Sequence, residues 1–126
     1  MCKQGMGDEQ TMSEDRLRAL LAMAEVQPDE MMVWYGLANE YVKLERWPEA
    51  VDALRRTVAL NPDYSSAYQM LGTALMNLDQ REGARLAWTE GVEVAGRTGA
   101  WKARQHMERL LAGMADPGEG GGLGAE

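Results

Sequence analysis

Residue types that could catalyse a reaction or bind a metal are scarce in this chain of 126 residues. Histidine and cysteine occur once each, as His106 and Cys2. A structural zinc site needs about four sulfur, nitrogen or carboxylate ligands, which these two residues do not provide. The sequence has no GxSxG nucleophile motif, no GxGxxG motif after a strand and no P-loop. We therefore predict that the chain is not an enzyme and uses neither a metal nor another cofactor.

Two groups of charged residues have a spacing of interest. The carboxylates of Glu40, Glu45 and Glu49 lie near a predicted turn, where we expect them on solvated helix faces. Closer to the C-terminus, Lys102, His106 and Arg109 follow one another at i, i+4 and i+7, which places them on one face of a helix. Such a basic stripe suits the binding of a carboxylate.

The helices that must position these residues show an internal period of 34 residues. Apolar or small residues between Met31 and Pro62 have apolar or small counterparts 34 positions later, between Ser65 and Gly96. The pairs are Trp34 with Tyr68, Leu37 with Leu71, Ala38 with Gly72, Tyr41 with Leu75, Ala50 with Ala84 and Leu54 with Trp88. A fixed period of this size is typical of helical repeat arrays. A heptad coiled coil is excluded because 34 is not a multiple of 7 and because prolines interrupt the pattern.

Both stretches resemble the tetratricopeptide repeat (TPR) family. The residues that carry the resemblance are Trp34, Leu37, Ala38, Tyr41, Ala50, Leu54 and Pro62 in the first unit, and Tyr68, Leu71, Gly72, Ala84, Trp88 and Gly91 in the second. The first unit departs from the motif at Thr57, and the second at Leu75 and Gly96. The resemblance implies an all-α fold, a right-handed α-solenoid of antiparallel helix pairs with about six helices, which binds other proteins.

We expect the repeats to form one helical domain between two irregular ends. The domain would cover residues 13–114, with a half repeat at 13–28, a repeat at 31–62, a repeat at 65–96 and a capping helix at 100–113. Ser13 is the expected N-cap of the first helix. The polar segment 1–12 is expected to be disordered, and the Gly-rich acidic segment 115–126 to be flexible.

Charge and composition narrow the class of partner. The chain has 13 Lys and Arg residues against 20 Asp and Glu residues, and its formal net charge is −7. We expect no nucleic acid partner, because phosphates require a basic face. We expect no membrane association, because no apolar run reaches the roughly 18 residues of a membrane span. The single cysteine and the absence of a visible signal-peptide core indicate the cytoplasm.

The resemblance also implies which residues would face a ligand. In a TPR array the first helix of each pair lines a concave groove, and its non-core positions here are Tyr35, Asn39, Lys43, Gln69, Thr73 and Asn77. If the last helix also lines that groove, Lys102, His106 and Arg109 add a basic wall. We expect this groove to bind a peptide segment of a partner protein. The alternative is a homo-oligomer, such as a homodimer, that associates through exposed helix faces.

Some TPR domains hold the C-terminal carboxylate of heat-shock chaperones with a clamp of Lys, Arg and two Asn residues. Asn39 matches one clamp position. Tyr35 stands where the clamp needs Lys, and Met70 stands where the second Asn belongs. We therefore do not expect this chain to form the chaperone clamp.

Overall fold

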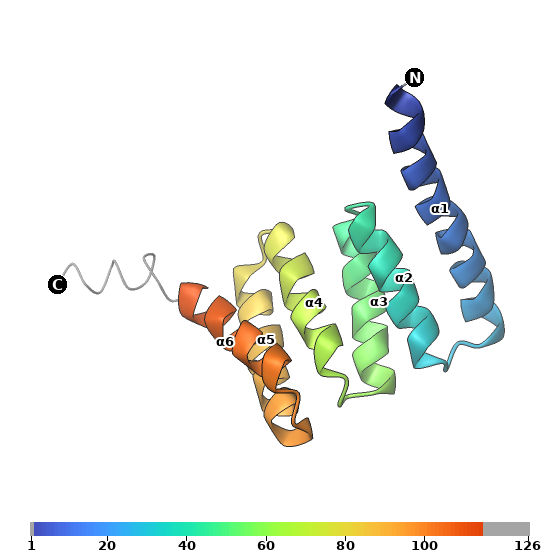
Figure 1. Cartoon of the computed structure of the whole chain (residues 1–126). Helices are drawn as coiled ribbons and strands as arrows, with labels where there is room; N and C mark the ends of the chain where they lie inside the picture. The colour runs from blue at the N-terminus through green and yellow to red at the C-terminus, as the bar shows by residue number, and fades with distance from the viewer. Residues whose placement is uncertain (1, 115–126) are drawn as a thin grey trace. The chain divides into compact units, whose positions relative to one another are not determined.

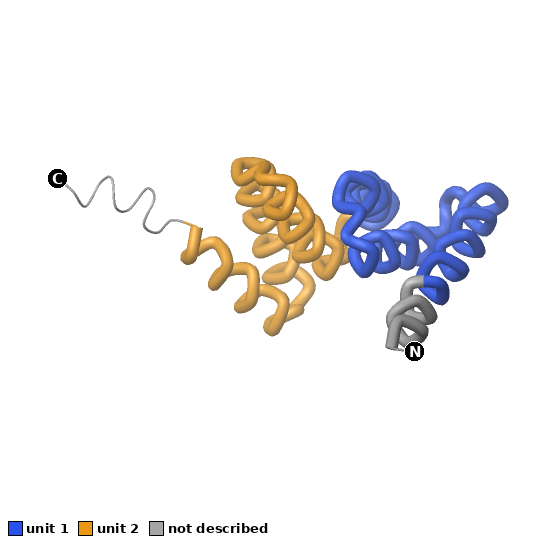
Figure 2. Tube along the Cα trace, turned by 90° about the horizontal axis from the view of Figure 1, so that it is seen from above, with its two compact units in different colours: residues 1–61 blue, residues 62–126 orange. Residues whose placement is uncertain are grey.

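The computed structural model describes residues 2–114, and side chains from residue 11 onward. Over that range the chain is all-α, with six helices: α1 (Cys2–Val26), α2 (Met31–Lys43), α3 (Trp47–Leu60), α4 (Ser65–Asn77), α5 (Arg81–Thr98) and α6 (Trp101–Met114) (Figure 1). The chain divides into two compact units, unit 1 (Met1–Asn61) and unit 2 (Pro62–Glu126) (Figure 2). Sequential helices pack as pairs within each unit, so the predicted all-α class is confirmed.

Unit 1 is built around α2, which packs against both α1 and α3 (Figure 1). The apolar residues of α2 recur every three or four positions, which gives the helix a buried face. The buried side chains of the unit include Leu17 and Ala24 of α1, Val33, Leu37, Ala38 and Tyr41 of α2, and Ala50, Val51 and Leu54 of α3. The small residues Ala38 and Ala50 are fully buried, as expected where two helix axes approach closely.

Unit 2 is built around α5, which packs against both α4 and α6. Its buried side chains include Tyr68, Leu71 and Leu75 of α4, Ala84, Trp88 and Val94 of α5, and Met107 and Met114 of α6. A Cβ at Gly91 would lie 2.8 Å from the Cβ of Tyr68 and 2.5 Å from the Sδ of Met107. Gly91 therefore lets α5 contact α4 and α6 at the same level.

The core confirms the 34-residue register. Leu37 and Leu71 are 1% and 5% exposed, so the same motif position is buried in both units. Thr57, where the TPR motif usually has a small residue, is also fully buried. Its hydroxyl donates to the carbonyl of Ala53 at 2.8 Å, so no buried polar group is left unsatisfied there.

The turns between α2 and α3 and between α4 and α5 are closed by the same main-chain hydrogen bonds. In the first turn, the N–H of Glu45 donates to the carbonyl of Val42 and the N–H of Arg46 donates to the carbonyl of Tyr41. In the second turn, the N–H of Asp79 donates to the carbonyl of Met76 and the N–H of Gln80 donates to the carbonyl of Leu75. All four distances are 2.9–3.0 Å. This is the Schellman arrangement of a helix C-terminus. Glu45 and Asp79 adopt its left-handed conformation, with φ of 56° and 62°.

A second repeated contact joins each unit's first motif aromatic to the proline break before it. The indole Nε1 of Trp34 donates to the carbonyl of Pro28 at 2.8 Å, and the hydroxyl of Tyr68 donates to the carbonyl of Pro62 at 2.9 Å. Burial is the main cause that raises the pKa of Tyr68, so its hydroxyl keeps its proton at neutral pH. The two contacts fix the start of α2 and of α4 in the same way.

The first helix is longer than the sequence analysis expected. We expected disorder over 1–12 and a helix beginning at Ser13, whereas α1 begins at Cys2. Ser13 therefore lies inside the helix, where it is buried, and it is not an N-cap. The segment contains no proline, and extending an existing helix adds one hydrogen bond for each residue fixed.

The fifth helix also extends beyond residue 96, where the second repeat was expected to end. Gly96 occupies the position that Pro62 has in the first repeat, so nothing removes the next helical hydrogen bond. The helix continues to Thr98 and ends at Gly99, whose φ of 81° suits glycine. The segment 115–126, for which we predicted a flexible tail, lies outside the described residues.

Candidate functional site

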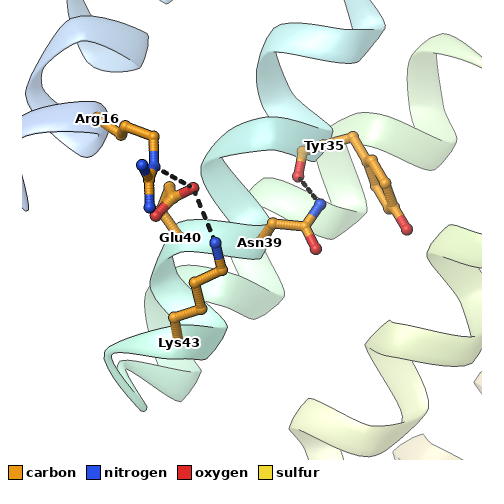
Figure 3. A network of polar contacts seen from close by, with 5 residues as sticks. All are labelled: Arg16, Tyr35, Asn39, Glu40 and Lys43. Atoms are coloured by element: carbon orange, nitrogen blue, oxygen red, sulfur yellow. Dashed lines mark hydrogen bonds and ion pairs between the residues drawn. The ribbon is translucent and has the colours of Figure 1, made fainter. Parts of the chain in front are cut away.

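Three of the predicted groove residues form a polar row along α2, and we call Tyr35, Asn39 and Lys43 the α2 row. They are spaced by four residues, so they lie one turn apart on one side of the helix. Tyr35 and Asn39 are half-buried, and Lys43 is exposed. The Nδ2 of Asn39 donates to the main-chain carbonyl of Tyr35 at 3.0 Å (Figure 3).

The same positions of the second repeat form the α4 row, which consists of Gln69, Thr73 and Asn77. Gln69 is half-buried, and the other two residues are exposed. The hydroxyl of Thr73 donates to the carbonyl of Gln69 at 3.2 Å, and the Nδ2 of Asn77 donates to the carbonyl of Thr73 at 2.9 Å. The side chains of Thr73 and Asn77 are thus held against the turn that precedes each of them.

The three predicted basic residues lie on the exposed side of α6. Lys102, His106 and Arg109 are all exposed, whereas Met107 and Met114 of the same helix are buried. The basic stripe and the α4 row both belong to unit 2, and the α2 row belongs to unit 1. The structure thus places every predicted groove residue at least partly at the surface, on three separate helices. That these residues bind a ligand stays a prediction.

The sequence analysis was wrong about Glu40, which is not on a solvated face. Its side chain is buried between α1 and α2, and the residue is 6% exposed. The Oε2 atom lies 3.3 Å from the Nε of Arg16 on α1 and 3.6 Å from the Nζ of Lys43 (Figure 3). The Oε1 atom has no hydrogen-bond partner within the described part of the chain. Lys43, predicted as a groove cation, is therefore already paired with a carboxylate.

Comparing the two repeats could have revealed the burial of Glu40. The residue 34 positions later is Ala74, which is fully buried, and alanine at that position indicates a core site. A carboxylate in the core is costly unless cations or hydrogen bonds compensate it. Arg16 supplies one such cation, and it comes from α1, which the motif alone did not define in detail.

The carboxylate of Glu49 contributes to the turn rather than to a site. The guanidinium of Arg46 donates to its Oε2 at 3.0 Å, and this hydrogen bond lowers the pKa of Glu49 and raises that of Arg46. The same guanidinium lies 5.2 Å from the ring centroid of Tyr41. Arg46 therefore contacts α3 through its ion pair with Glu49 and α2 through its cation–π contact with Tyr41.

Neither a metal site nor a membrane span is found in the described residues. Among them, no three His, Cys, Asp or Glu side chains gather closely enough to hold a metal ion. Within residues 2–114, no helix combines the length and the apolar character that crossing a bilayer requires.

Comparison with known sequences decides the family. The family model of the tetratricopeptide repeat matches residues 31–74. A TPR repeat-containing protein of Pseudomonas aeruginosa is 30% identical over 83 residues, which cover 66% of this chain and 79% of that protein. The chain belongs to the TPR family. The resemblance inferred from the two repeats is thereby confirmed.

Solved structures support the TPR fold over most of the chain. A solution structure of a Bordetella parapertussis protein is 29% identical, with a TM-score of 0.69, and the match covers 79% of this chain and 86% of that one. The TPR2B domain of yeast Sti1, solved in complex with an Hsp70 peptide, has a TM-score of 0.72. It is 17% identical, and the match covers 84% of this chain and 87% of that domain. At that identity the likeness shows the fold alone.

Proposed function

We propose that this TPR protein binds a peptide segment of a partner protein through the exposed faces of α2, α4 and α6. TPR domains are in general protein-interaction modules. The observation that carries the proposal is the pair of equivalent polar rows. Both rows stand at the same motif positions, and hydrogen bonds to helix carbonyls orient the amides of Asn39 and Asn77 and the hydroxyl of Thr73.

The likeness to the Sti1 domain supports a peptide as the ligand, since that domain was solved with an Hsp70 peptide. The chemistry of recognition would differ, because this chain lacks the clamp residues at Tyr35 and Met70. The net charge of −7 supports a protein partner over a nucleic acid, and nothing favours a membrane. We place this function in the cytoplasm, on the strength of the single cysteine.

The test is selection of a peptide followed by mapping of its contacts. A random dodecapeptide library displayed on phage would be selected on the immobilised full chain, and one selected peptide would be titrated into isotope-labelled protein. We expect the largest amide shifts on α2, α4 and α6. Shifts confined to the exposed faces of α3 and α5 would rule the proposal out, and so would the failure of every selected peptide to bind.

A matched pair of variants checks the same point by affinity. We expect Asn39→Ala and Asn77→Ala to weaken binding of the selected peptide, because each removes a polar group from its row. Asp52→Ala removes an exposed polar group from α3 instead and serves as the control. Equal losses for all three variants would speak against a site on the two rows.

Self-association is the second candidate function, and α1 provides the observation that favours it. Met12, Met23 and Val26 are 53%, 46% and 79% exposed. Together with Ala19 they follow i, i+7, i+11 and i+14, which is one face of a helix. A homodimer could bury this apolar face. Light scattering over a concentration series tests this function, since a strict monomer would eliminate it.

A further inference from the structure

Four residues on one face of α1 stand at repeat positions that are buried in other helices. We call them the α1 stripe: Met12, Ala19, Met23 and Val26. Ala19 stands 34 positions before Ala53 and 68 positions before Ala87, and both of these residues are buried. Val26 stands 68 positions before Val94, which is buried as well. In α1, all four residues of the stripe are exposed.

In α5 the equivalent face packs against the first helix of the same repeat. Gly91 stands 68 positions after Met23, and a Cβ added there would lie 2.8 Å from the Cβ of Tyr68 on α4. A turn of a few residues joins α4 to α5, so the two helices run antiparallel. The face is therefore suited to receive a helix that runs in the opposite direction.

The first helix that would cover this face of α1 is missing from the half repeat. α1 packs on α2 through a different side, which contains the buried residues Leu17 and Ala24 (Figure 1). Leu20 lies on that side too, since its Cδ2 would be 3.3 Å from a Cβ added to Gly36 of α2. Within residues 11–114, no other helix buries the α1 stripe.

The α1 stripe is symmetric about Ala19. Met12 lies seven residues before Ala19, and Val26 lies seven residues after it. A two-fold axis at Ala19, relating two antiparallel copies of α1, would place Met12 of one copy opposite Val26 of the other. The small side chain of Ala19 would stand at the centre, where it allows the helix axes to approach closely, as Ala38 and Ala50 do in unit 1.

The charged residues beside the stripe do not oppose such a contact. Asp15 and Arg16 flank the stripe on its two edges. Arg18 donates to the carboxylate of Asp15 at 2.9 Å, and Arg16 donates to that of Glu40 at 3.3 Å. Both charges are thus compensated within their own chain, so covering the stripe leaves neither of them unpaired.

We infer that α1 pairs with α1 of a second copy as an antiparallel two-fold dimer centred on Ala19. This inference rests on self-association, the second candidate function, and names the contact that produces it. The stripe is small against the roughly 800 Å² that each partner buries in a stable complex. The dimer is therefore weak. It forms at high protein concentration, once salt screens the repulsion between two chains of net charge −7.

Disulfide trapping in the full chain tests the position of the axis. In a Cys2→Ser background, Ala19→Cys places one thiol of each copy at the axis, where the Cα atoms fall within the range of about 4.4–6.8 Å that a disulfide spans. Ala59→Cys, at an exposed alanine of α3, is the matched control. At about 1 M salt, where the screening length is roughly 3 Å, we expect about tenfold more linked dimer from Ala19→Cys. Equal amounts from both variants would overturn the inference.

A mixture of two further cysteine variants tests the antiparallel orientation. Positions 12 and 26 are about 21 Å apart along the helix, at 1.5 Å per residue. Antiparallel pairing therefore links Met12→Cys of one chain to Val26→Cys of another, and links neither variant to itself. We expect the mixed disulfide to dominate in the mass spectrum of the unreduced mixture. Dimers of each variant with itself in excess would indicate parallel pairing and contradict the inference.

A charge placed on the axis tests the same contact without a covalent trap. Ala19→Glu makes two carboxylates face each other in the contact, which is unfavourable even at high salt because they lose water. Ala59→Glu adds the same charge on α3. Light scattering over a concentration series at about 1 M salt should show the parent and Ala59→Glu rising from 13.9 kDa towards twice that mass. Ala19→Glu should stay at 13.9 kDa, and its association to the same extent as the parent would refute the contact.

The outcomes separate this inference from the functions on which it draws. A parent chain that stays monomeric throughout eliminates self-association and the inference together, and leaves peptide binding unaffected. A dimer that is insensitive to Ala19→Glu keeps self-association and refutes the α1 contact. Masses that grow beyond two copies would indicate an open array instead of a closed two-fold dimer, and they would also refute the inference.

Discussion

The two repeats fill the same place in their cores with different pairs of side chains. Unit 1 has Ala38 and Leu54 at positions where unit 2 has Gly72 and Trp88. A Cβ added to Gly72 would overlap the indole of Trp88, which donates to the carbonyl of Gln69 at 3.1 Å. The larger side chain on one helix thus requires the smaller one on its neighbour, as close packing demands.

This complementarity predicts strong coupling between Gly72 and Trp88. We expect Gly72→Ala to lower the free energy of unfolding by about 1–3 kcal/mol through overpacking. In a Trp88→Leu background the same change recreates the pair of unit 1, and it should then be neutral or stabilising. Urea denaturation of the two single variants and the double variant gives the coupling energy, expected at about 1–3 kcal/mol.

Gly113 provides the control for this cycle. It is a helical glycine of α6 with nothing within 4 Å of an added Cβ. Gly113→Ala should stabilise the protein by up to about 1 kcal/mol, the difference in helix propensity. Additive effects of Gly72→Ala and Trp88→Leu would contradict the packing argument.

The buried carboxylate of Glu40 gives a second prediction for single residues. Removing Arg16 leaves Glu40 with only Lys43, so we expect Arg16→Ala to cost about 1–3 kcal/mol. Glu40→Ala should cost less, because the side chains of Arg16 and Lys43 are 49% and 55% exposed and can be solvated. Glu40→Ala should also cancel most of the loss caused by Arg16→Ala. Urea denaturation checks all three variants, and a larger loss for Glu40→Ala than for Arg16→Ala would refute this account.

Among the elements, the two turns carry a backbone cost that a substitution can remove. Glu45 and Asp79 are in the left-handed conformation, which costs a residue other than glycine about 1–2 kcal/mol. Replacing the residue with glycine removes this cost, but glycine has more conformational entropy in the unfolded chain, which offsets roughly 0.5–1 kcal/mol of the stabilisation. We therefore expect Asp79→Gly and Glu45→Gly each to raise the free energy of unfolding by up to about 1 kcal/mol. Thermal melting measures it, and a lower melting temperature for both variants would contradict the prediction.

The helices were predictable from the sequence to different degrees, for physical reasons. The span from α2 to α4 followed from apolar periodicity and from prolines that interrupt it, such as Pro62. The start of α1 and the C-terminal end of α5 were missed because no residue there prevents a helix from continuing, so local sequence alone does not fix these boundaries. The sequence shows Gly96 at the position where the first repeat has Pro62. Because glycine has a main-chain N–H and proline does not, the continuation of α5 past this position could have been predicted.

The candidate site was predictable only as a set of positions. The family resemblance indicated the rows on α2 and α4, because the motif assigns a face to each helix position. The direction of the amide of Asn39 depends on a main-chain carbonyl one turn away, which composition cannot reveal. The pairing of Lys43 with Glu40 depends on α1, whose contact with α2 is set by tertiary packing.

For the whole molecule, net charge and the exposed apolar face of α1 oppose each other. The formal net charge of −7 at pH 7 keeps copies apart, and it vanishes near the sequence pI of about 4.7. We expect light scattering to give the monomer mass of 13.9 kDa at pH 7 and low salt, and a rising mass as the pH approaches 4.7. Protonation of carboxylates removes the repulsion, so association increases as the pH falls.

A charge-neutral control separates the two causes of association. Replacing Met12, Met23 and Val26 together with Gln keeps the net charge and removes the exposed apolar face of α1. We expect this variant to stay monomeric closer to the isoelectric point. If its association matches that of the parent chain at every pH, the face of α1 is not the contact.

The hydrogen bonds that close the two hairpin turns come from main-chain groups alone, so the side chains on these turns can be changed without opening them. After Cys2→Ser, cysteines introduced at Glu45 and Asp79 would carry a donor and an acceptor dye on turns of equal geometry, one in each unit. Energy transfer between the dyes would then follow the separation of the two units while a peptide binds. The repeated turn thus also provides equivalent labelling positions in the two units for measuring any change in the distance between them.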